Sequence, residues 1–364
     1  MDDTYKIYPW FDGHVHLRGS RGWGYGGFRT IVEATAFQCR YAVVMPNSPV
    51  IKTVDEMIKY RRLIRNSAKK YPWFEPLMTL YLTADTPSSE IVKAAQFEWF
   101  AGFKLYPEGV TTGSEGGVRD FSKLGRVLED IDAVGGRLLI HAEMSGVDPL
   151  CAERAFIEGP MVQIRERFKG LICIEHCSTA QAVQFVLDHD RTYGSITAHH
   201  LNGTFKEMID NPFNRCKPVW QTEENRQVLI KVLKMENQRK FYAGTDSAPH
   251  PTPAKMSNNP PNGCYTAPIA VALYRRAFDE ALNLPTSSLL ETKAWNNFLY
   301  DNATRFYDID RFHMYHVGPV LQLGNEAMHS QQKDGLLTLN ITSPVEEFVG
   351  LPTFERLTVG KQFI

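Results

Sequence analysis

The sequence predicts an α/β fold in which eight parallel strands close into a (β/α)₈ barrel that carries a small C-terminal extension. Short apolar runs recur along the chain, and stretches with helical spacing separate them. The runs are almost continuously apolar, which is typical of parallel strands buried on both faces. The chain has 364 residues and is 43% hydrophobic, which is enough for one large barrel with insertions.

The eight expected strands lie between residue 8 and residue 250. An open doubly wound sheet is the alternative arrangement, but no G-x-G-x-x-G motif follows the first strand. We expect the strands at 8–17, 41–47, 74–82, 102–107, 136–143, 170–178, 194–201 and 239–250.

Three stretches between the strands carry clear helical signals. In 53–71, apolar residues recur at helical spacing, and Thr53 is a plausible N-cap. The stretch 122–136 ends on a glycine pair, which is a good helix stop. A third helix is expected over 179–190, with Ser178 as its cap.

The sequence predicts a barrel followed by a short C-terminal extension. We expect the barrel, with its N-terminal strand, to occupy residues 1–317. Residues 318–364 contain mixed short apolar runs, so we expect an extension that packs on the barrel or adds a small sheet.

Composition excludes several classes of protein. The net charge is −1 and no basic stripe is interleaved with aromatics, so a nucleic-acid partner is not expected. The six cysteines lie far apart without a C-x-x-C pair, which argues against a disulfide framework. No signal sequence and no apolar run near 18 residues occurs, so we expect a soluble cytoplasmic protein without a membrane partner.

Polar residues of unusual type fall at the ends of the expected strands. In a barrel these ends converge on one mouth, where catalytic residues are usually found. Burying such groups without partners costs several kcal/mol, so packing alone explains them poorly. The residues are His14, His16, Asn47, Lys104, His141, His176 and Asp246.

Histidine and carboxylate ligands together suit zinc, with nickel, manganese, cobalt or iron as alternatives. Lys104 is unexpected there because an ammonium repels a cation. A lysine held neutral beside two cations can add CO₂ and become a carbamate, which bridges metals as a carboxylate does. Spacing alone does not establish the carbamate.

Eight segments, in order along residues 8 to 310, resemble those of dihydroorotases in the amidohydrolase superfamily. The resemblance is to the shorter single-chain class of many bacteria and yeast, whose fold is a metal-dependent TIM barrel. The segments are "DGHVHLR" (12–18), "VVMPN" (43–47), "GFKLYPEGVTT" (102–112), "LIHAE" (139–143), "IEHCST" (174–179), "TAHHL" (197–201), "NRCKPV" (214–219) and "GTDSAPHP" (244–251).

This resemblance implies two zinc ions bridged by a carbamylated lysine (N6-carboxylysine). It also implies that one aspartate is both a ligand and the general base and acid. The implied ligands are His14, His16 and Asp246 for the more buried ion, His141 and His176 for the second, and Lys104 for both, with Asp246 also catalytic.

The resemblance implies a substrate site as well. A carboxylate would be held by side chains from three loops, a mobile loop would close over the ring, and backbone groups would hold the pyrimidine edge. These residues are Arg18, Asn47 and His250 for the carboxylate, Thr111 and Thr112 in the loop, and Lys217 and Asn262 for the edge.

The implied reaction is the reversible cyclisation of N-carbamoyl-L-aspartate to L-dihydroorotate and water, in de novo pyrimidine biosynthesis, through a metal-activated hydroxide. The alternatives are another cyclic amidohydrolase (a dihydropyrimidinase, hydantoinase or allantoinase) and a non-catalytic dihydroorotase-like scaffold. Members of this class are often homodimers. We expect His199 and His200 to end the seventh strand and to be structural.

Overall fold

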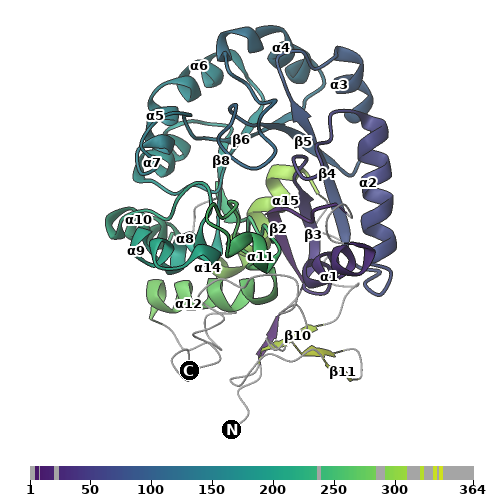
Figure 1. Cartoon of the computed structure of the whole chain (residues 1–364), viewed down its shortest axis with the longest axis vertical. Helices are drawn as coiled ribbons and strands as arrows, with labels where there is room; N and C mark the ends of the chain where they lie inside the picture. The colour runs from purple at the N-terminus through teal and green to yellow at the C-terminus, as the bar shows by residue number, and fades with distance from the viewer. Residues whose placement is uncertain are drawn as a thin grey trace.

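The computed structural model describes residues 5–7, 9–19, 24–235, 239–283, 292–309, 320–323, 331–333 and 336–338. Within these residues, eight parallel strands form one sheet whose order follows the chain from β2 to β9. Helices surround the strands as an outer ring (Figure 1). The predicted barrel is confirmed, with every expected strand present. The strands are β2 (Trp10–Val15), β3 (Cys39–Val44), β4 (Glu75–Leu82), β5 (Phe100–Leu105), β6 (Arg137–His141), β7 (Leu171–Glu175), β8 (Thr192–Ile196) and β9 (Phe241–Ala243).

The barrel closes where the first strand meets the segment that follows the last one. The Asp246 amide donates to the His14 carbonyl at 2.8 Å, and the His16 amide donates to the Ser247 carbonyl at 3.0 Å. Val15 and Ser247 form a parallel bridge at the same place. Closure therefore brings residues more than 230 positions apart in the sequence into direct contact.

Most of the outer helices connect successive strands. They are α1 (Gly24–Ala36), α2 (Val54–Ser67), α3 (Ser88–Ala94), α4 (Gly125–Ala133), α5 (Ala152–Glu158), α6 (Pro160–Arg167), α7 (Ala180–Asp188), α8 (Ala198–Asn202), α9 (Phe205–Ile209), α10 (Glu223–Leu233), α11 (Thr252–Lys255), α12 (Ala270–Leu282), α14 (Lys293–Asn296) and α15 (Asn302–Tyr307), with the π-helical turn η4 (Asn297–Asp301) before α15.

Helix α2 begins as the sequence predicts. The Thr53 side chain accepts from the Glu56 amide, and the Glu56 carboxylate accepts from the Thr53 amide, which completes a capping box. The start of α7 differs by one position from our expectation. Its cap is Thr179, which accepts from the Ala182 amide, and not Ser178. Ser178 instead donates its own amide to Glu153.

Apolar side chains fill the lower part of the barrel interior. The interior cluster combines strand residues with residues from η4 and α15, which lie across the N-terminal ends of the strands. The rings of Phe11 and Tyr307 stack with centroids 5.4 Å apart. The polar residues at the opposite end therefore rest on an apolar floor. The cluster consists of Phe11, Tyr41, Val43, Met45, Leu77, Ala101, Leu139, Cys173, Tyr242, Tyr300, Ala303, Phe306 and Tyr307.

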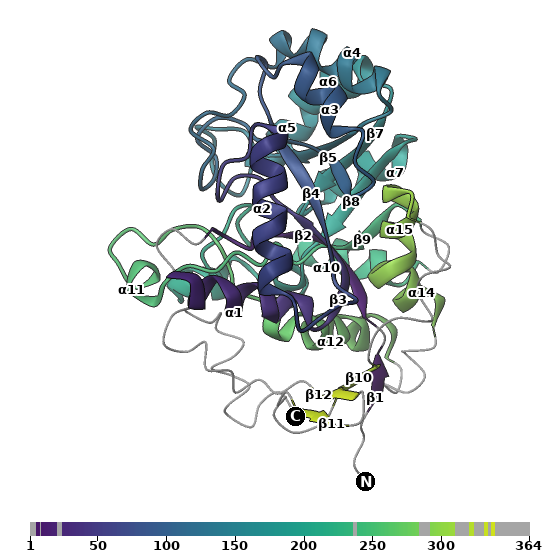
Figure 2. The same ribbon diagram turned by 90° about the vertical axis from the view of Figure 1, so that its right-hand side faces the viewer.

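A second, four-stranded sheet lies outside the ring of helices (Figure 2). It joins β1 (Tyr5–Ile7) to strands from the C-terminal part of the chain, in the order β1-β10-β12-β11, with β10 at Val320–Leu323, β11 at Gln331–Lys333 and β12 at Leu336–Thr338. The boundary expected at residue 317 lies outside the described residues.

All six cysteines are free thiols, as the sequence predicts. Cys151 is exposed and the other five are buried. Among the described helices, none combines the length and the apolar character needed to cross a bilayer.

Candidate active site

The two histidines of the first barrel strand meet Asp246 at the barrel mouth. Oδ1 of Asp246 lies 2.9 Å from Nε2 of His16 and 3.3 Å from Nε2 of His14. The two Nε2 atoms are 3.3 Å apart. Burial alone would raise the pKa of Asp246, but His14 and hydrogen bonds from both histidines hold it well below its usual range. Three buried donor atoms thus point at one small volume.

Three of the predicted residues adopt a left-handed backbone. Arg18, His176 and Asp246 have φ values of 60°, 44° and 47°. A residue other than glycine in this region costs about 1–3 kcal/mol and is found mainly at functional sites. The expected strands 170–178 and 239–250 are therefore too long, because β7 stops at Glu175 and β9 stops at Ala243. The turns that follow direct the side chains of His176 and Asp246 into the mouth.

The second pair of histidines lies beside the first. The rings of His141 and His176 have centroids 4.6 Å apart, and the ring of His176 lies 5.2 Å from that of His14. Burial, together with the neighbouring His141, lowers the pKa of His176 well below its usual value. Donor atoms of His14, His176 and Asp246 all lie within 4.8 Å of one another. Burial lowers the pKa of His141 and His176, which favours neutral rings with lone pairs available to an ion, whereas the pKa of His14 is raised because the Glu175 and Asp246 carboxylates outweigh its burial.

Lys104 projects from β5 into this group of ligands. Its side chain is fully buried, and Nζ has no hydrogen-bond partner among the described residues. Burial lowers the pKa of Lys104, although the Glu175 carboxylate opposes the shift. A buried amine that is driven toward the neutral form and lacks a partner is the nucleophile that carbamate formation requires. The donor set and Lys104 together therefore fit a metal centre with a carbamylated lysine.

Two acidic residues that the sequence analysis missed orient the histidines. Oε2 of Glu175 lies 2.5 Å from Nδ1 of His14, and it also accepts from the Ser195 hydroxyl at 2.8 Å. Oε2 of Glu143 lies 2.6 Å from Nε2 of His141. A carboxylate on one ring nitrogen fixes the tautomer and leaves the other nitrogen free for a metal. Glu175 directly precedes the predicted ligand His176, and Glu143 lies two residues after the predicted ligand His141. These positions are the sequence signal that would have identified both acids.

One narrow cavity collects most of the predicted substrate residues. It opens above His16 and Asp246. All predicted substrate-binding residues except His250 line it, together with Ala248 and Gly263: Arg18, Asn47, Thr111, Thr112, Lys217 and Asn262.

Arg18, which lines this cavity, contacts His250, which does not line it. Nη2 of Arg18 lies 2.9 Å from Nε2 of His250, and Nε of Arg18 donates to the Pro249 carbonyl at 2.9 Å. Burial lowers the pKa of Arg18 to about 10, so the guanidinium stays charged at neutral pH. Burial, with Arg18 as the next cause, lowers the pKa of His250 to about 2. Arg18 therefore presents one fixed positive charge to the cavity.

The loop that carries Thr111 and Thr112 lies over the cavity. Nδ2 of Asn47 donates to the Thr112 carbonyl at 2.8 Å. Gly113 has a φ of 69°, and a Cβ there would lie 2.3 Å from the Asn47 carbonyl oxygen. Only glycine permits this close approach of the loop to the segment after β3.

Lys217 and Asn262 reach the cavity on two adjacent segments that a buried lysine connects. Nζ of Lys255 donates to the carbonyls of Arg215 at 3.0 Å, Pro261 at 3.0 Å and Gly263 at 2.9 Å. The Lys217 side chain also approaches Glu143, with 3.8 Å between Nζ and Oε1. Lys255 thus sets the relative position of both segments.

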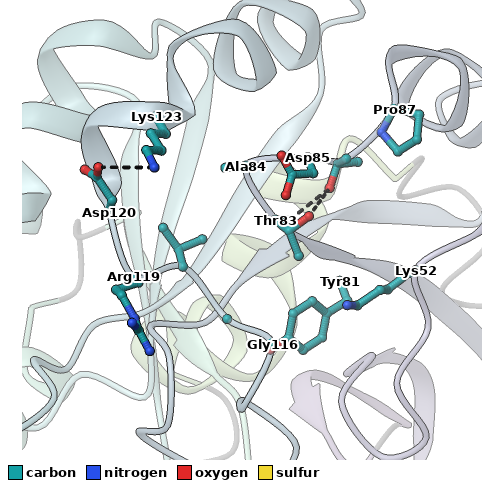
Figure 3. A pocket seen from close by; sticks show the side chains of 13 residues that line it. Lys52, Tyr81, Thr83, Ala84, Asp85, Pro87, Gly116, Arg119, Asp120 and Lys123 are labelled. Atoms are coloured by element: carbon teal, nitrogen blue, oxygen red, sulfur yellow. Dashed lines mark hydrogen bonds and ion pairs between the residues drawn. The ribbon is translucent and has the colours of Figure 1, made fainter.

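A larger cavity of ≈ 490 Å³ lies beside the base of the same loop (Figure 3). None of the predicted site residues lines it. Two of its cations are already paired, Arg119 with Glu108 and Lys123 with Asp120 at 3.9 Å. Size alone therefore does not identify the candidate site, because the predicted residues line the smaller cavity.

Comparison with known proteins agrees with this geometry. No family model matches the chain. A dihydroorotase from Acidovorax sp. (strain JS42) is 39% identical over 288 residues, which cover 77% of this chain and 81% of that protein. A dihydroorotase from Synechocystis sp. is 37% identical over 281 residues, covering 75% and 80%. The chain belongs to the dihydroorotase family.

Solved structures share the fold of this chain. The dihydroorotase of Saccharomyces cerevisiae in complex with 5-fluoroorotic acid has a TM-score of 0.76 at 27% identity, covering 85% of this chain and 87% of that one. A dihydroorotase from Campylobacter jejuni has the same TM-score at 24% identity and covers 97% of both chains. An L-hydantoinase from Arthrobacter aurescens, at 15% identity and a TM-score of 0.68, shares the fold.

Proposed function

We propose that this chain catalyses the dihydroorotase reaction, the reversible cyclisation of N-carbamoyl-L-aspartate to L-dihydroorotate and water. The observation that carries the proposal is the cavity at the barrel mouth. It joins His16 and Asp246, which belong to the metal-binding group, to Arg18 and Asn47. A small cyclic amide with a carboxylate needs both kinds of residue within the length of one ring.

The proposed ligands are two sets of buried donors and a shared lysine. His14, His16 and Asp246 would hold one zinc ion, His141 and His176 would hold the other, and carbamylated Lys104 would serve both. When bound, such ions polarise a carbonyl oxygen and make water more acidic. Glu175 and Glu143 would keep the rings of His14 and His141 in the binding tautomer.

Arg18 would bind the substrate carboxylate, with Asn47 and His250 beside it. The guanidinium is charged and already fixed by the Pro249 carbonyl, so little side-chain entropy is lost on binding. A charge-assisted hydrogen bond of this kind contributes about 1.5–3 kcal/mol. Backbone groups of Lys217 and Asn262, positioned by Lys255, would contact the opposite edge of the ring.

Asp246 would move the proton. Its depressed pKa keeps the carboxylate unprotonated at neutral pH, so it accepts a proton from the attacking water in the hydrolytic direction. The same group then delivers the proton to the leaving ring nitrogen. In cyclisation the order is reversed.

The loop of Thr111 and Thr112 would act as a cover that opens for substrate. The cavity beneath it measures ≈ 20 Å³, which is smaller than a dihydroorotate ring requires. The hydrogen bond from Asn47 to Thr112 is the contact that must break or shift for entry.

The test is an assay of the purified protein supplied with zinc and bicarbonate. We expect interconversion of carbamoyl aspartate and dihydroorotate, and loss of metal and nearly all rate in Lys104→Ala. Arg18→Met should raise KM for dihydroorotate about 10- to 150-fold, which is 1.5–3 kcal/mol converted at 1.4 kcal/mol per decade.

The wild-type enzyme should also prefer dihydroorotate to dihydrouracil, which lacks the carboxylate. Faster cleavage of dihydrouracil would refute the proposal in favour of a dihydropyrimidinase. A homodimer and a cytoplasmic location stay predictions from the sequence.

A further inference from the structure

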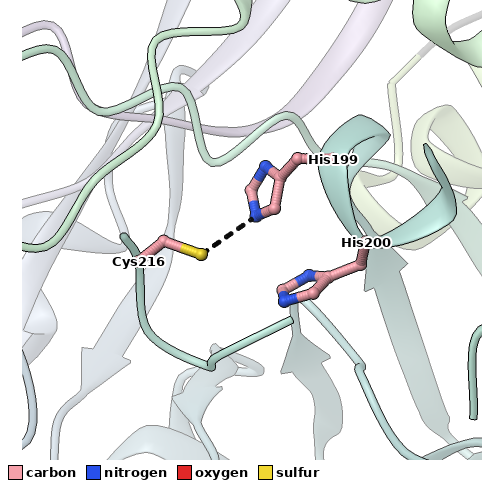
Figure 4. A group of neighbouring side chains, drawn as sticks. All are labelled: His199, His200 and Cys216. Atoms are coloured by element: carbon pink, nitrogen blue, oxygen red, sulfur yellow. Dashed lines mark hydrogen bonds between the residues drawn. The ribbon is translucent and has the colours of Figure 1, made fainter. Parts of the chain in front are cut away.

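A second group of metal-binding residues lies after β8. His199 and His200 lie in helix α8, and Cys216 lies on the facing segment (Figure 4). We call these three residues the thiol–imidazole cluster. The expectation that the two histidines end a strand is wrong, because β8 stops at Ile196 and Thr197 caps α8 by accepting from the His200 amide.

The ligand atoms of the cluster lie close enough together to share one ion. One donor atom from each residue lies within 4.8 Å of the other two. Nε2 of His199 is 3.7 Å from Sγ of Cys216. A tetrahedral zinc ion with bonds of about 2.3 Å to sulfur and 2.05 Å to nitrogen holds these ligands about 3.6 Å apart. The observed separation of Nε2 of His199 and Sγ of Cys216 therefore already matches that of two ligands of one ion.

The cluster is buried and its hydrogen bonding is incomplete. The exposed fractions of His199, His200 and Cys216 are 0%, 3% and 1%. Nδ1 of His199 has no hydrogen-bond partner among the described residues, so the long contact with the thiol is its ring's only polar contact there. The ring of Trp220 stacks on His199 at 5.9 Å and 18°, which restrains its orientation. A polar group held in place at this depth without full partners is typical of a ligand site.

The other two members have weak partners that an ion can replace. Sγ of Cys216 and Nε2 of His200 both contact the Pro218 carbonyl, at 3.2 Å and 3.1 Å. Nδ1 of His200 contacts the Thr197 hydroxyl at 2.8 Å. When Nε2 binds an ion, the Thr197 contact remains and fixes the ring from the other side.

We propose that the thiol–imidazole cluster binds a divalent cation of the zinc class at a site separate from the predicted metal centre. The ligands are Nε2 of His199, Nε2 of His200 and the thiolate of Cys216, with water as the fourth. Binding releases the thiol proton to solvent, so the charge balances. None of the six predicted ligands of the main centre is a cysteine, which distinguishes the two sites chemically.

The location gives this site a structural role. Cys216 directly precedes Lys217, which lines the substrate cavity. An ion shared with α8 would tie the segment 215–218 to the barrel, in addition to the hydrogen bond from Lys255 to the Arg215 carbonyl. The proposal stands without the proposed function, because its observations include no residue of the main centre.

The probe is Co²⁺, which replaces zinc and reports sulfur ligation directly. Metal-free protein titrated with Co²⁺ should develop a near-ultraviolet thiolate-to-cobalt charge-transfer absorption, which imidazole and carboxylate ligands do not produce. We expect this absorption in the wild type, its loss in Cys216→Ser, and one metal equivalent fewer per chain in that variant. Cys39→Ser is the matched control, because Cys39 is also buried but lies at the start of β3, at the N-terminal end of the barrel.

Absence of the charge-transfer absorption in the wild type at saturating Co²⁺ overturns the proposal, and this result needs no variant to fold. Retention of the absorption in Cys216→Ser overturns it as well. His199→Asn should shift or weaken the band, whereas an unchanged band removes His199 from the ligand set. Dihydroorotate turnover measured on the same wild-type samples tests the proposed function separately.

Discussion

Replacing Glu175 with glutamine tests whether the carboxylate that faces His14 controls metal binding. The substitution keeps the volume and the Ser195 contact but removes the charge that faces Nδ1 of His14 at 2.5 Å. A hydrogen bond to a charged partner contributes about 1.5–3 kcal/mol, and one to a neutral partner about 1 kcal/mol. The loss of about 0.5–2 kcal/mol corresponds to a metal affinity weaker by about 2- to 30-fold, which overlaps the 10- to 100-fold that such outer partners typically contribute.

The measurement is zinc affinity by competition with a chromophoric chelator, followed by dihydroorotate turnover at saturating zinc. Ser195→Ala is the control for a change without loss of charge, because it removes the hydrogen bond to Glu175 and the one accepted from the His176 amide; we expect a smaller effect than that of Glu175→Gln. Equal zinc affinity in Glu175→Gln and the wild type would refute the reasoning. Weaker binding with turnover restored at high zinc supports a positioning role for Glu175.

Three further predictions concern the cover loop, the substrate-edge segments and a buried acid. Gly113→Ala should raise KM for dihydroorotate because the new Cβ would lie 2.3 Å from the Asn47 carbonyl oxygen. The control is Gly109→Ala, since Gly109 has a similar φ of 70° but a Cβ there would meet no atom within 4 Å. Equal effects of the two substitutions on KM would contradict the clash. Lys255→Met removes three hydrogen bonds and should lower the free energy of unfolding, measured by urea titration, by about 2–4 kcal/mol. It should also raise KM for dihydroorotate. An unchanged free energy of unfolding and an unchanged KM would show that Lys255 does not position the two segments. Burial raises the pKa of Glu153 from 4.5 to about 8, so its contribution to stability should be lost as the pH rises from 4.5 to 8. Glu153→Gln should therefore flatten the dependence of Tm on pH. A variant whose Tm changes with pH as the wild-type Tm does would contradict this prediction.

The regular part of the fold follows from local patterns. Apolar runs and glycine or threonine boundaries identified all eight barrel strands and the start of α2, because those signals act within a few residues. The cap of α7 was placed one residue early, since Ser178 and Thr179 have similar capping ability and only the packed Glu153 decides between them. The strand ends at Glu175 and Ala243 were missed because left-handed turns at His176 and Asp246 leave no clear sequence signal.

Residue type and strand position predicted His16, Asn47 and Asp246, and the family resemblance implied the other substrate residues of the candidate site. His16, Arg18, Asn47, Thr111, Thr112, Lys217, Asp246 and Asn262 do line one cavity. Glu143, Glu175 and Lys255 were missed because their roles arise from contacts between distant segments. Cys216 and His199 lie 17 residues apart, and only the fold shows that they meet.

Packing of the barrel interior depends on residues of the turn η4 and the helix α15, which lie close to position 300. Tyr300, Ala303, Phe306 and Tyr307 fill the bottom of the cylinder against Phe11, which the ribosome adds almost 300 residues earlier. A nascent chain that has not yet emerged to residue 307 leaves this interior open to water. The apolar floor of the barrel is therefore completed only once residue 307 has been added, and deletions just past residue 296 should behave as folding defects although they lie at the end opposite the metal-binding group.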